Sequence, residues 1–169
     1  MSLLDLDAML SQNLETVEAA PEFVTLETGV YDLKVVKVDA KKREAKDKAA
    51  AAAAGKATEW FDLVITYGVE NTVSLEKSDA LPPKPGSLIQ ENFQFTEKGL
   101  PYFKSRVVAI AVAMVGTEAD ANSLSPKDVM DTFPGVATFR ANVKKNVENG
   151  VGDKVYEKNR ITNVVAVPA

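Results

Sequence analysis

The chain has 169 residues, of which 46% are hydrophobic and 26% charged, and its formal net charge is −4. This length suits one globular domain with extra material at an end or in a loop, and the composition argues against wholesale disorder. Because the chain has no Cys and no His, disulfides, thiolate metal sites, and the commonest general base and zinc ligand are excluded.

No stretch reaches the roughly 18 apolar residues that a membrane-spanning helix needs, and the N-terminus lacks the layout of a secretory signal. We therefore expect an intracellular protein that has no membrane partner. We also expect that it uses no cofactor.

Charge is distributed unevenly along the chain. Residues 1–28 hold six acidic residues and no Lys or Arg, and residues 57–135 hold eleven acidic residues against six basic ones. By contrast, residues 34–56 hold eight basic residues against three acidic, and residues 136–163 hold six against three. Positive charge is thus concentrated in two separated stretches that can converge in a fold.

The first 28 residues are expected to form an acidic arm ahead of a folded domain that spans residues 29–169. Leu3 to Leu10 offers a short apolar stripe on a helix, and polar, acidic sequence follows up to Pro21. One interpretation is a frayed, solvated terminus. The other is an arm that docks on a partner or on the protein's own basic surface.

Two predicted strands flank a basic segment. Gly29 to Asp39 is rich in β-branched and aromatic residues, and Glu59 to Tyr67 alternates, with Phe61 on the apolar face and Trp60 on the other. Residues 40–58 contain six consecutive alanines and many lysines. Because an isolated helix this short is marginal in water, we expect a long, mobile, basic loop there.

The second half of the chain predicts one more strand, two helices and a final hairpin. Strand character resumes from Leu88 to Thr96, after a proline-rich break. A helix is predicted from Pro101 to about Gly116, and a short one follows the capping box that Ser125 begins. Strands over residues 136–145 and 155–167 then flank the turn dipeptide at 149–150.

Five strands with helical material between the third and fourth are typical of the OB fold. The predicted class is therefore mainly β with helical insertions, arranged as a five-stranded OB-type barrel. In that fold, one barrel face and the loops joining strands 1 to 2 and 4 to 5 line the oligonucleotide groove. The two basic stretches fall at those places.

A groove for single strands needs cations along the phosphates and flat rings on which bases stack. Trp60 and Tyr156 are the predicted stacking residues, because each lies off the apolar face of its strand. For Trp60, packing against a helix is an equal alternative, and each lysine taken singly suits a solvated face. The candidate cations are Lys41, Lys42, Arg43, Lys46, Lys48, Lys56, Arg140, Lys144, Lys145, Lys154, Lys158 and Arg160.

Three stretches, 22–31, 60–65 and 135–164, resemble bacteriophage-encoded single-stranded-DNA-binding proteins, and the likeness covers roughly residues 20 to 167. The resemblance implies an OB fold that protects single-stranded DNA during phage replication or recombination, in the cytoplasm of the infected bacterial host. Unlike the better-known bacterial relatives, the chain has no acidic C-terminal tip. The acidic arm can take over the recruitment of replication or recombination proteins, or lie in the groove until DNA displaces it. Formation of a homo-oligomer is left open.

Two other function classes fit parts of the sequence. A magnesium-dependent nuclease would need converging carboxylates, for which Asp62, Glu91 and Glu157 are the candidates. A virion or assembly protein would use a barrel and a long arm for protein contacts, without DNA. No P-loop, nucleophile-elbow or dinucleotide fingerprint is present.

Overall fold

The computed structural model describes residues 3–16, 19–116 and 121–168. Its centre is one antiparallel sheet of five strands in the order β3-β2-β1-β4-β5. The strands are β1 (Gly29–Glu44), β2 (Glu59–Leu75), β3 (Leu88–Gln94), β4 (Thr138–Asn149) and β5 (Val155–Val165). The mainly β class that the sequence predicts is confirmed.

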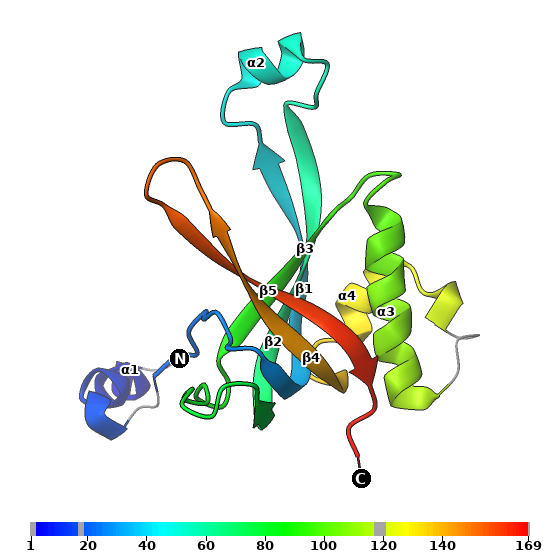
Figure 1. Cartoon of the computed structure of the whole chain (residues 1–169). Helices are drawn as coiled ribbons and strands as arrows, with labels where there is room; N and C mark the ends of the chain where they lie inside the picture. Colours follow the sequence, from blue (N-terminus) through cyan, green and yellow to red (C-terminus); the bar gives the residue numbers. More distant parts are fainter. Residues whose placement is uncertain (1–2, 17–18, 117–120, 169) are drawn as a thin grey trace.

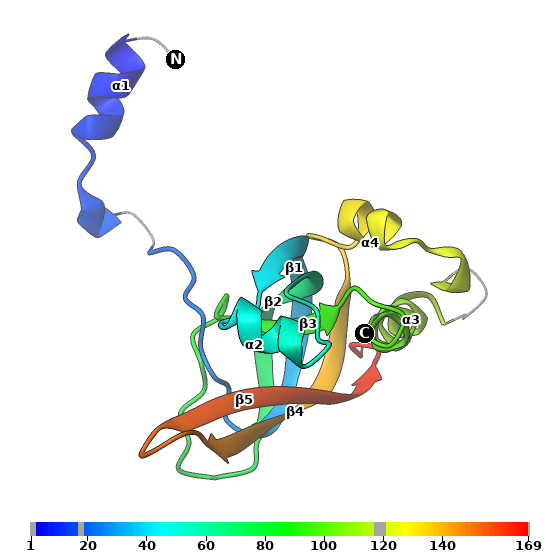
Figure 2. The ribbon, with the colours of Figure 1, turned by 90° about the horizontal axis from the view of Figure 1, so that it is seen from above.

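The helices precede the sheet or connect its strands. They are α1 (Leu3–Leu10), η1 (Leu14–Thr16), α2 (Lys48–Ala53), α3 (Leu100–Val115), η2 (Ala121–Ser123) and α4 (Pro126–Thr132). α3 and α4 lie together on one side of the sheet, whereas α1 stands away from it (Figures 1 and 2). The predicted helical material between the third and fourth strands is therefore present.

Local sequence signals explain where α3 and α4 begin and end. α3 buries Phe103 and Val107 at helical spacing, and it ends at Gly116, whose φ of 78° suits glycine. At the start of α4, the Ser125 side chain accepts a hydrogen bond from the Asp128 amide, and the Asp128 carboxylate accepts one from the Ser125 amide. This capping box satisfies two amide donors of the helix terminus, as predicted.

The core lies between the inner face of the sheet and α3. Tyr31, Leu33 and Val35 on β1 are fully buried, as their alternation predicts. Tyr67 and Phe139 meet edge to face there, with their ring centroids 5.4 Å apart. This packing supplies the buried apolar surface that stabilises a domain of this size.

The sheet is not closed into a barrel. The neighbour relations β1–β2, β2–β3, β1–β4 and β4–β5 are all present, but β3 and β5 form the two edges and do not pair. A different segment lies beside the start of β3: the Val24 amide donates to the Leu88 carbonyl, and the Leu88 amide donates to the Glu22 carbonyl. The five-stranded OB-type barrel is therefore not confirmed, because the five antiparallel strands form one open sheet.

The basic segment at residues 40–58 is more regular than the predicted loop. β1 continues through Glu44, which pairs with Glu59 of β2. Hydrogen bonds to β2 satisfy the backbone groups of residues 40–44, although these residues lack the apolar alternation typical of a strand. Asp47 then caps α2 by accepting a hydrogen bond from the Ala50 amide. Two short connections, residues 45–47 and 54–58, join α2 to the strands, and α2 buries none of its residues.

The acidic arm is shorter than predicted. Leu26 is fully buried, and Phe23 forms a bridge with Leu88, so residues 22–28 belong to the folded domain. Residues 3–16 lie apart from it (Figure 2), and Glu18 of the predicted arm lies outside the described residues.

Among the described residues, no helix combines the length and apolar character needed to cross a membrane.

Candidate nucleic-acid interface

A groove runs between the edges of β3 and β5, which do not pair with each other. One pocket of about 520 Å³ is lined by residues 89–93 of β3 and 157–159 of β5, together with Val24 and Thr25. A second pocket of about 380 Å³ continues it toward α3 and shares Glu91, Phe93 and Asn159 with the first. We call this continuous depression the β3–β5 groove.

Arg106 of α3 forms a clasp at the wall of the groove. Its guanidinium donates to both carboxylate oxygens of Glu91 on β3, at 2.9 and 3.1 Å, and to the Ile161 carbonyl of β5 at 2.8 Å. The Tyr67 hydroxyl donates to the same carboxylate at 2.6 Å. Burial, and then the nearby charge of Glu91, raises the pKa of Tyr67 well above its ordinary value. This tyrosine therefore stays a donor and holds Glu91 in place.

Asn159 forms a second clasp across the opposite part of the groove. Its side-chain amide donates to the Leu26 carbonyl and accepts from the Leu26 amide, both at 2.8 Å. The amide group thus imitates a neighbouring strand, and it joins β5 to the segment that lies beside β3. The two clasps hold the edges together without a backbone ladder between them.

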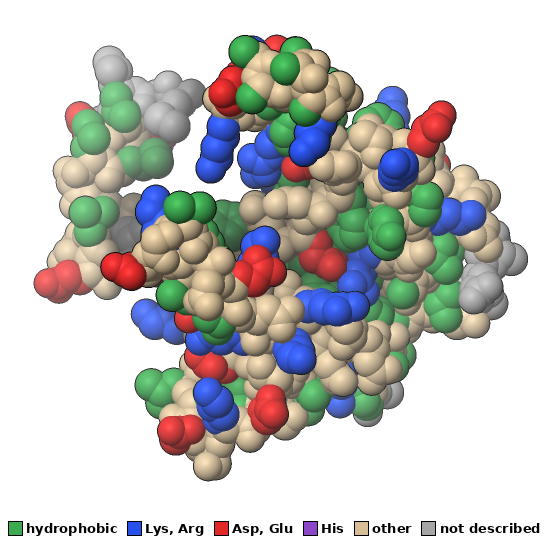
Figure 3. Space-filling model, turned by 45° about the horizontal axis from the view of Figure 1, so that its top comes forward, with side chains coloured by type: hydrophobic (Ala, Val, Ile, Leu, Met, Phe, Trp, Pro, Cys, Tyr) green, Lys and Arg blue, Asp and Glu red, His purple; other side chains and the backbone are tan. Residues whose placement is uncertain are grey.

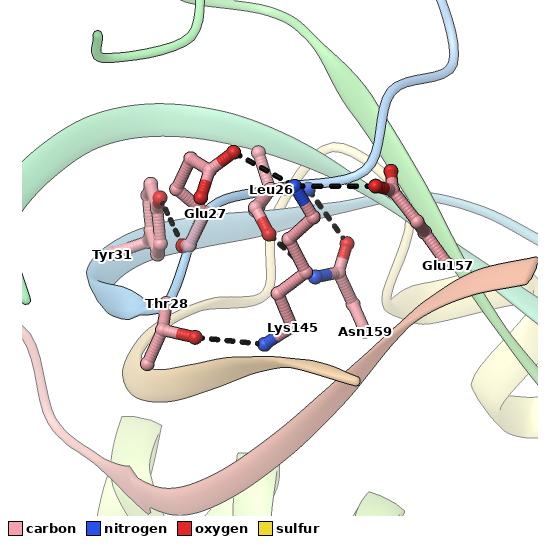
Figure 4. Close-up of polar contacts among 7 residues, drawn as sticks. All are labelled: Leu26, Glu27, Thr28, Tyr31, Lys145, Glu157 and Asn159. Atoms are coloured by element: carbon pink, nitrogen blue, oxygen red, sulfur yellow. Dashed lines mark hydrogen bonds and ion pairs between the residues drawn. The ribbon is translucent and has the colours of Figure 1, made fainter. Parts of the chain in front are cut away.

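Lys145 is committed to the same region (Figure 4). Its ammonium group contacts Glu27 at 2.9 Å and Glu157 at 3.4 Å, and its amide donates to the Thr28 hydroxyl. The hydrogen bond with Lys145 lowers the pKa of Glu27, and the same bond raises the pKa of Lys145. This lysine was a predicted DNA contact, but the structure places it in an anchor for residues 26–28.

Two hairpins flank the groove as arms (Figure 1). The first arm, residues 40–61, is the distal part of β1 and β2 with α2 at its tip. It carries six basic and three acidic residues. The second arm, residues 144–160, is the distal part of β4 and β5 and carries five basic and three acidic residues. Both arms are therefore net positive in a chain that is net negative.

Half of the twelve candidate cations are held by carboxylates. Besides Lys145, these are Lys42 with Glu59, Arg43 with Asp62, Lys48 with Glu44 and Glu59, Arg140 with Asp32, and Lys158 with Glu148. Arg140 pairs with a strand neighbour on β1 and lies outside both arms. The pairs formed by Lys42, Arg43, Lys48 and Lys158 lie within the arms or at their base, and most of the side chains in these pairs are exposed.

The remaining six cations make no ion pair within the described part of the chain, and all lie on the arms. They are Lys41, Lys46 and Lys56 on the first arm and Lys144, Lys154 and Arg160 on the second. Arg160 also lines the β3–β5 groove. Figure 3 shows basic side chains on both sides of the hollow between the arms, with acidic ones among them. These six are the cations most available to phosphates.

The two predicted stacking residues differ in freedom. Tyr156 is half-exposed on the second arm. Trp60 is half-buried, and its indole nitrogen donates to Asp62, which also accepts from Arg43. Trp60 therefore sits in a polar cluster on the first arm and does not belong to the buried core.

Three exposed aromatic rings that the sequence pattern did not indicate lie near the groove and the first arm. Phe61, predicted on the apolar face of its strand, and Phe95, within the strand predicted from Leu88 to Thr96, are each 50% exposed. They are cross-strand neighbours, because the Phe95 amide donates to the Phe61 carbonyl. Tyr102, which is 72% exposed, lines the groove with Phe93. Alternating apolar residues predict which face of a strand each side chain lies on. They do not indicate where along the strand the buried core ends, so the exposure of these rings could not be predicted.

The carboxylates considered for a metal site serve other partners. Asp62 binds Arg43 and Trp60, Glu91 binds Arg106 and Tyr67 as described above, and Glu157 pairs with Lys145. Among the described residues, no three acidic side chains converge as metal ligands. The proposed nuclease arrangement therefore finds no support in the geometry.

Comparisons of this chain with protein-family models, curated proteins and solved structures found no significant match. We therefore infer the function from the geometry and charge of the groove and its arms.

Proposed function

We propose that this protein binds single-stranded DNA without sequence preference and without catalysing a reaction on it. One observation carries the proposal: a groove between two sheet edges is flanked by two net-positive arms, and six cations on these arms make no ion pair with the described residues. Single-strand binding sites combine such cations with exposed rings on which bases stack. The role this supports is protection of single strands during phage replication or recombination, as the resemblance implies.

The strand would lie along the groove between the arms. Its phosphates would meet Lys56 and Arg160 from opposite sides, and its bases would stack on Phe61, Phe95 and Tyr102. Bases of every kind present a π face, so this arrangement predicts weak sequence preference.

Titration with poly-dT at two salt concentrations tests the proposal. Trp60 is the only tryptophan and lies on the first arm, so we expect its fluorescence to change on binding. Affinity should fall steeply as salt rises, because neutralised phosphates release counterions. Phe95→Leu keeps an apolar side chain but removes the ring, and it should weaken binding by about 1–3 kcal/mol.

A charge-matched pair of variants locates the interface. Replacing Lys56 and Arg160 with alanine should reduce the salt slope by about 1.4, since each lost contact with a single strand accounts for about 0.7. Replacing Lys84 and Lys127, which lie outside both arms, changes the net charge equally and should leave the slope almost unchanged. Equal effects of the two double variants, or no binding by the native chain, would contradict the proposal. The second outcome would favour an assembly protein.

A further inference from the structure

α1 presents an apolar stripe that stays exposed among the described residues. Leu6, Met9 and Leu10 recur at helical spacing, and they are 43%, 61% and 75% exposed. The helix stands clear of the sheet and of α3 and α4 (Figure 2). An isolated helix of eight residues is marginal in water, so a surface that covers this stripe would stabilise it.

A pocket of about 180 Å³ on the helical side of the molecule matches such a stripe. It lies where α3, η2 and α4 meet, and its walls include Phe103, Val107, Val108, Leu124 and Val129. A cavity of about 150 Å³ accepts a ligand the size of benzene. The pocket therefore has room for an aliphatic side chain, and we call it the helix pocket.

Charge complementarity links the two surfaces. Among the described residues that line the helix pocket, Lys104 is the only charged one, and it makes no ion pair with any of the described residues. Residues 1–21, which precede the folded domain, contain four carboxylates and no Lys or Arg, and two of the four, Asp5 and Asp7, lie on α1. An acidic helix with an apolar stripe thus matches an apolar pocket with a cation on its rim, which is the usual pattern of a helix bound in a groove.

The direction of the arm indicates which molecule supplies the helix. Residues 22–26 are fastened beside β3 and β5, and from there the chain leads away from α3 and α4 (Figures 1 and 2). α1 therefore lies away from its own helix pocket.

We propose that α1 of one copy binds in the helix pocket of a second copy. The stripe of Leu6, Met9 and Leu10 faces the pocket, and the acidic side of the arm faces Lys104. The two surfaces are different patches of the chain, so the contact is heterologous. Successive copies therefore join head to tail, and they form a closed ring only if the rotation between neighbouring copies brings the last copy back to the first. This contact needs no DNA.

Sedimentation of the full chain without DNA, over a range of concentrations, tests the proposal. We expect reversible association of the native chain. Lys104→Glu places a carboxylate opposite the acidic arm without removing a buried side chain, and it should weaken association about tenfold. Lys154→Glu makes the same charge change on the second arm and serves as the matched control, expected to associate like the native chain.

Mixing two defective variants gives the sharper result. The double variant Leu6→Glu/Leu10→Glu keeps an intact pocket, whereas Lys104→Glu keeps an intact α1. Each should sediment mainly as a monomer, and their equimolar mixture should form a 1:1 dimer that grows no further, because only one functional contact remains.

Three outcomes would overturn the proposal. These are a native chain that stays monomeric at every concentration, a mixture that forms no dimer, and a loss of association caused by Lys154→Glu instead of Lys104→Glu. The last result would place the acidic arm on the basic arms. Since no DNA is present, failure here leaves the proposed single-strand binding to be decided by its own titration.

Discussion

Asp32 on β1 and Arg140 on β4 are cross-strand neighbours, and they form an ion pair that links the two strands. The guanidinium donates to both carboxylate oxygens, at 2.7 and 3.2 Å. The Asp32 side chain is only 11% exposed, so the pair is partly removed from water. Asn71 on β2 donates to the same carboxylate. Arg140 therefore joins strands, although its position on a polar strand face suggested a phosphate contact.

This pair predicts a pH-dependent contribution to stability. The hydrogen bond from Arg140 lowers the pKa of Asp32 below its ordinary value, so the unfolded chain takes up a proton before the folded chain does. The contribution is fully present above about pH 4, the ordinary range of an aspartate, and is lost as the pH falls through the lowered pKa. Asp32→Asn should therefore destabilise the protein at neutral pH, and the difference should shrink in acid.

Urea unfolding of both chains over a pH series measures this difference. Asp39→Asn is the matched control, because Asp39 contacts the largely exposed Lys37 and surface pairs contribute little. A constant difference between Asp32→Asn and the native chain at every pH would contradict the assignment.

The two arms explain how single elements of this fold provide its candidate binding surface. β1 and β2 have 16 and 17 residues, well above the five or six of a common strand. Their core portions are buried, but Trp60 and Phe61 near the start of β2 lie at the margin of the core. Strand pairing thus continues where packing ends, and it carries rings and cations out to the groove.

The tip of the first arm should be dispensable for folding but not for binding. The Ala45 amide donates to the Thr58 carbonyl, so a two-residue Asn-Gly turn in place of residues 46–57 can close the hairpin. Because α2 buries no residue, the free energy of unfolding should change by less than about 0.5 kcal/mol. Binding to poly-dT should weaken, with a smaller salt slope, because Lys46 and Lys56 are lost.

Chemical denaturation and the same fluorescence titration measure the two effects separately. A large loss of stability would show that the tip supports the fold, and unchanged DNA affinity would remove the first arm from the interface.

At the scale of the whole molecule, the open edges of the sheet are held by side chains. Arg106 joins β3 to β5 from α3, and Asn159 joins β5 to the segment beside β3. In paired strands, many backbone hydrogen bonds would hold two edges together. Between β3 and β5, the side chains of Arg106 and Asn159 make the contacts described above. The edges can therefore separate more easily than paired strands would.

Arg106 should be the more costly clasp to remove. Arg106→Met keeps most of the side-chain volume but leaves the partly buried Glu91 carboxylate with only the Tyr67 hydroxyl, and it should lower the free energy of unfolding by about 2–4 kcal/mol. Amides of β3 and β5 should also exchange faster. The double variant Arg106→Met/Glu91→Gln removes the stranded charge and should recover part of the loss.

Hydrogen exchange and urea unfolding of both variants check this prediction. If Arg106→Met is as stable as the native chain, or if the second substitution recovers nothing, the clasp does not hold the edges.

Local patterns in the sequence determined a large part of this fold. Alternating side chains located the five strands, the capping box at Ser125 and the stop at Gly116 placed the ends of the helices, and counting charges located both basic arms. These features depend on residues close together in the chain, where periodicity and capping act.

Only the tertiary structure decided whether the sheet closes, how far the strands extend beyond the core, and which cations are free. The carboxylate partners of Arg140 and Lys145 lie more than a hundred positions away in the chain, and the pairing of β1 with β4 brings these distant segments together. The free energy of such a pair depends on burial and geometry, which no local pattern contains. Composition and spacing could therefore locate the basic stretches. They could not distinguish the cations that form ion pairs within the sheet from those on the arms that are available to phosphates.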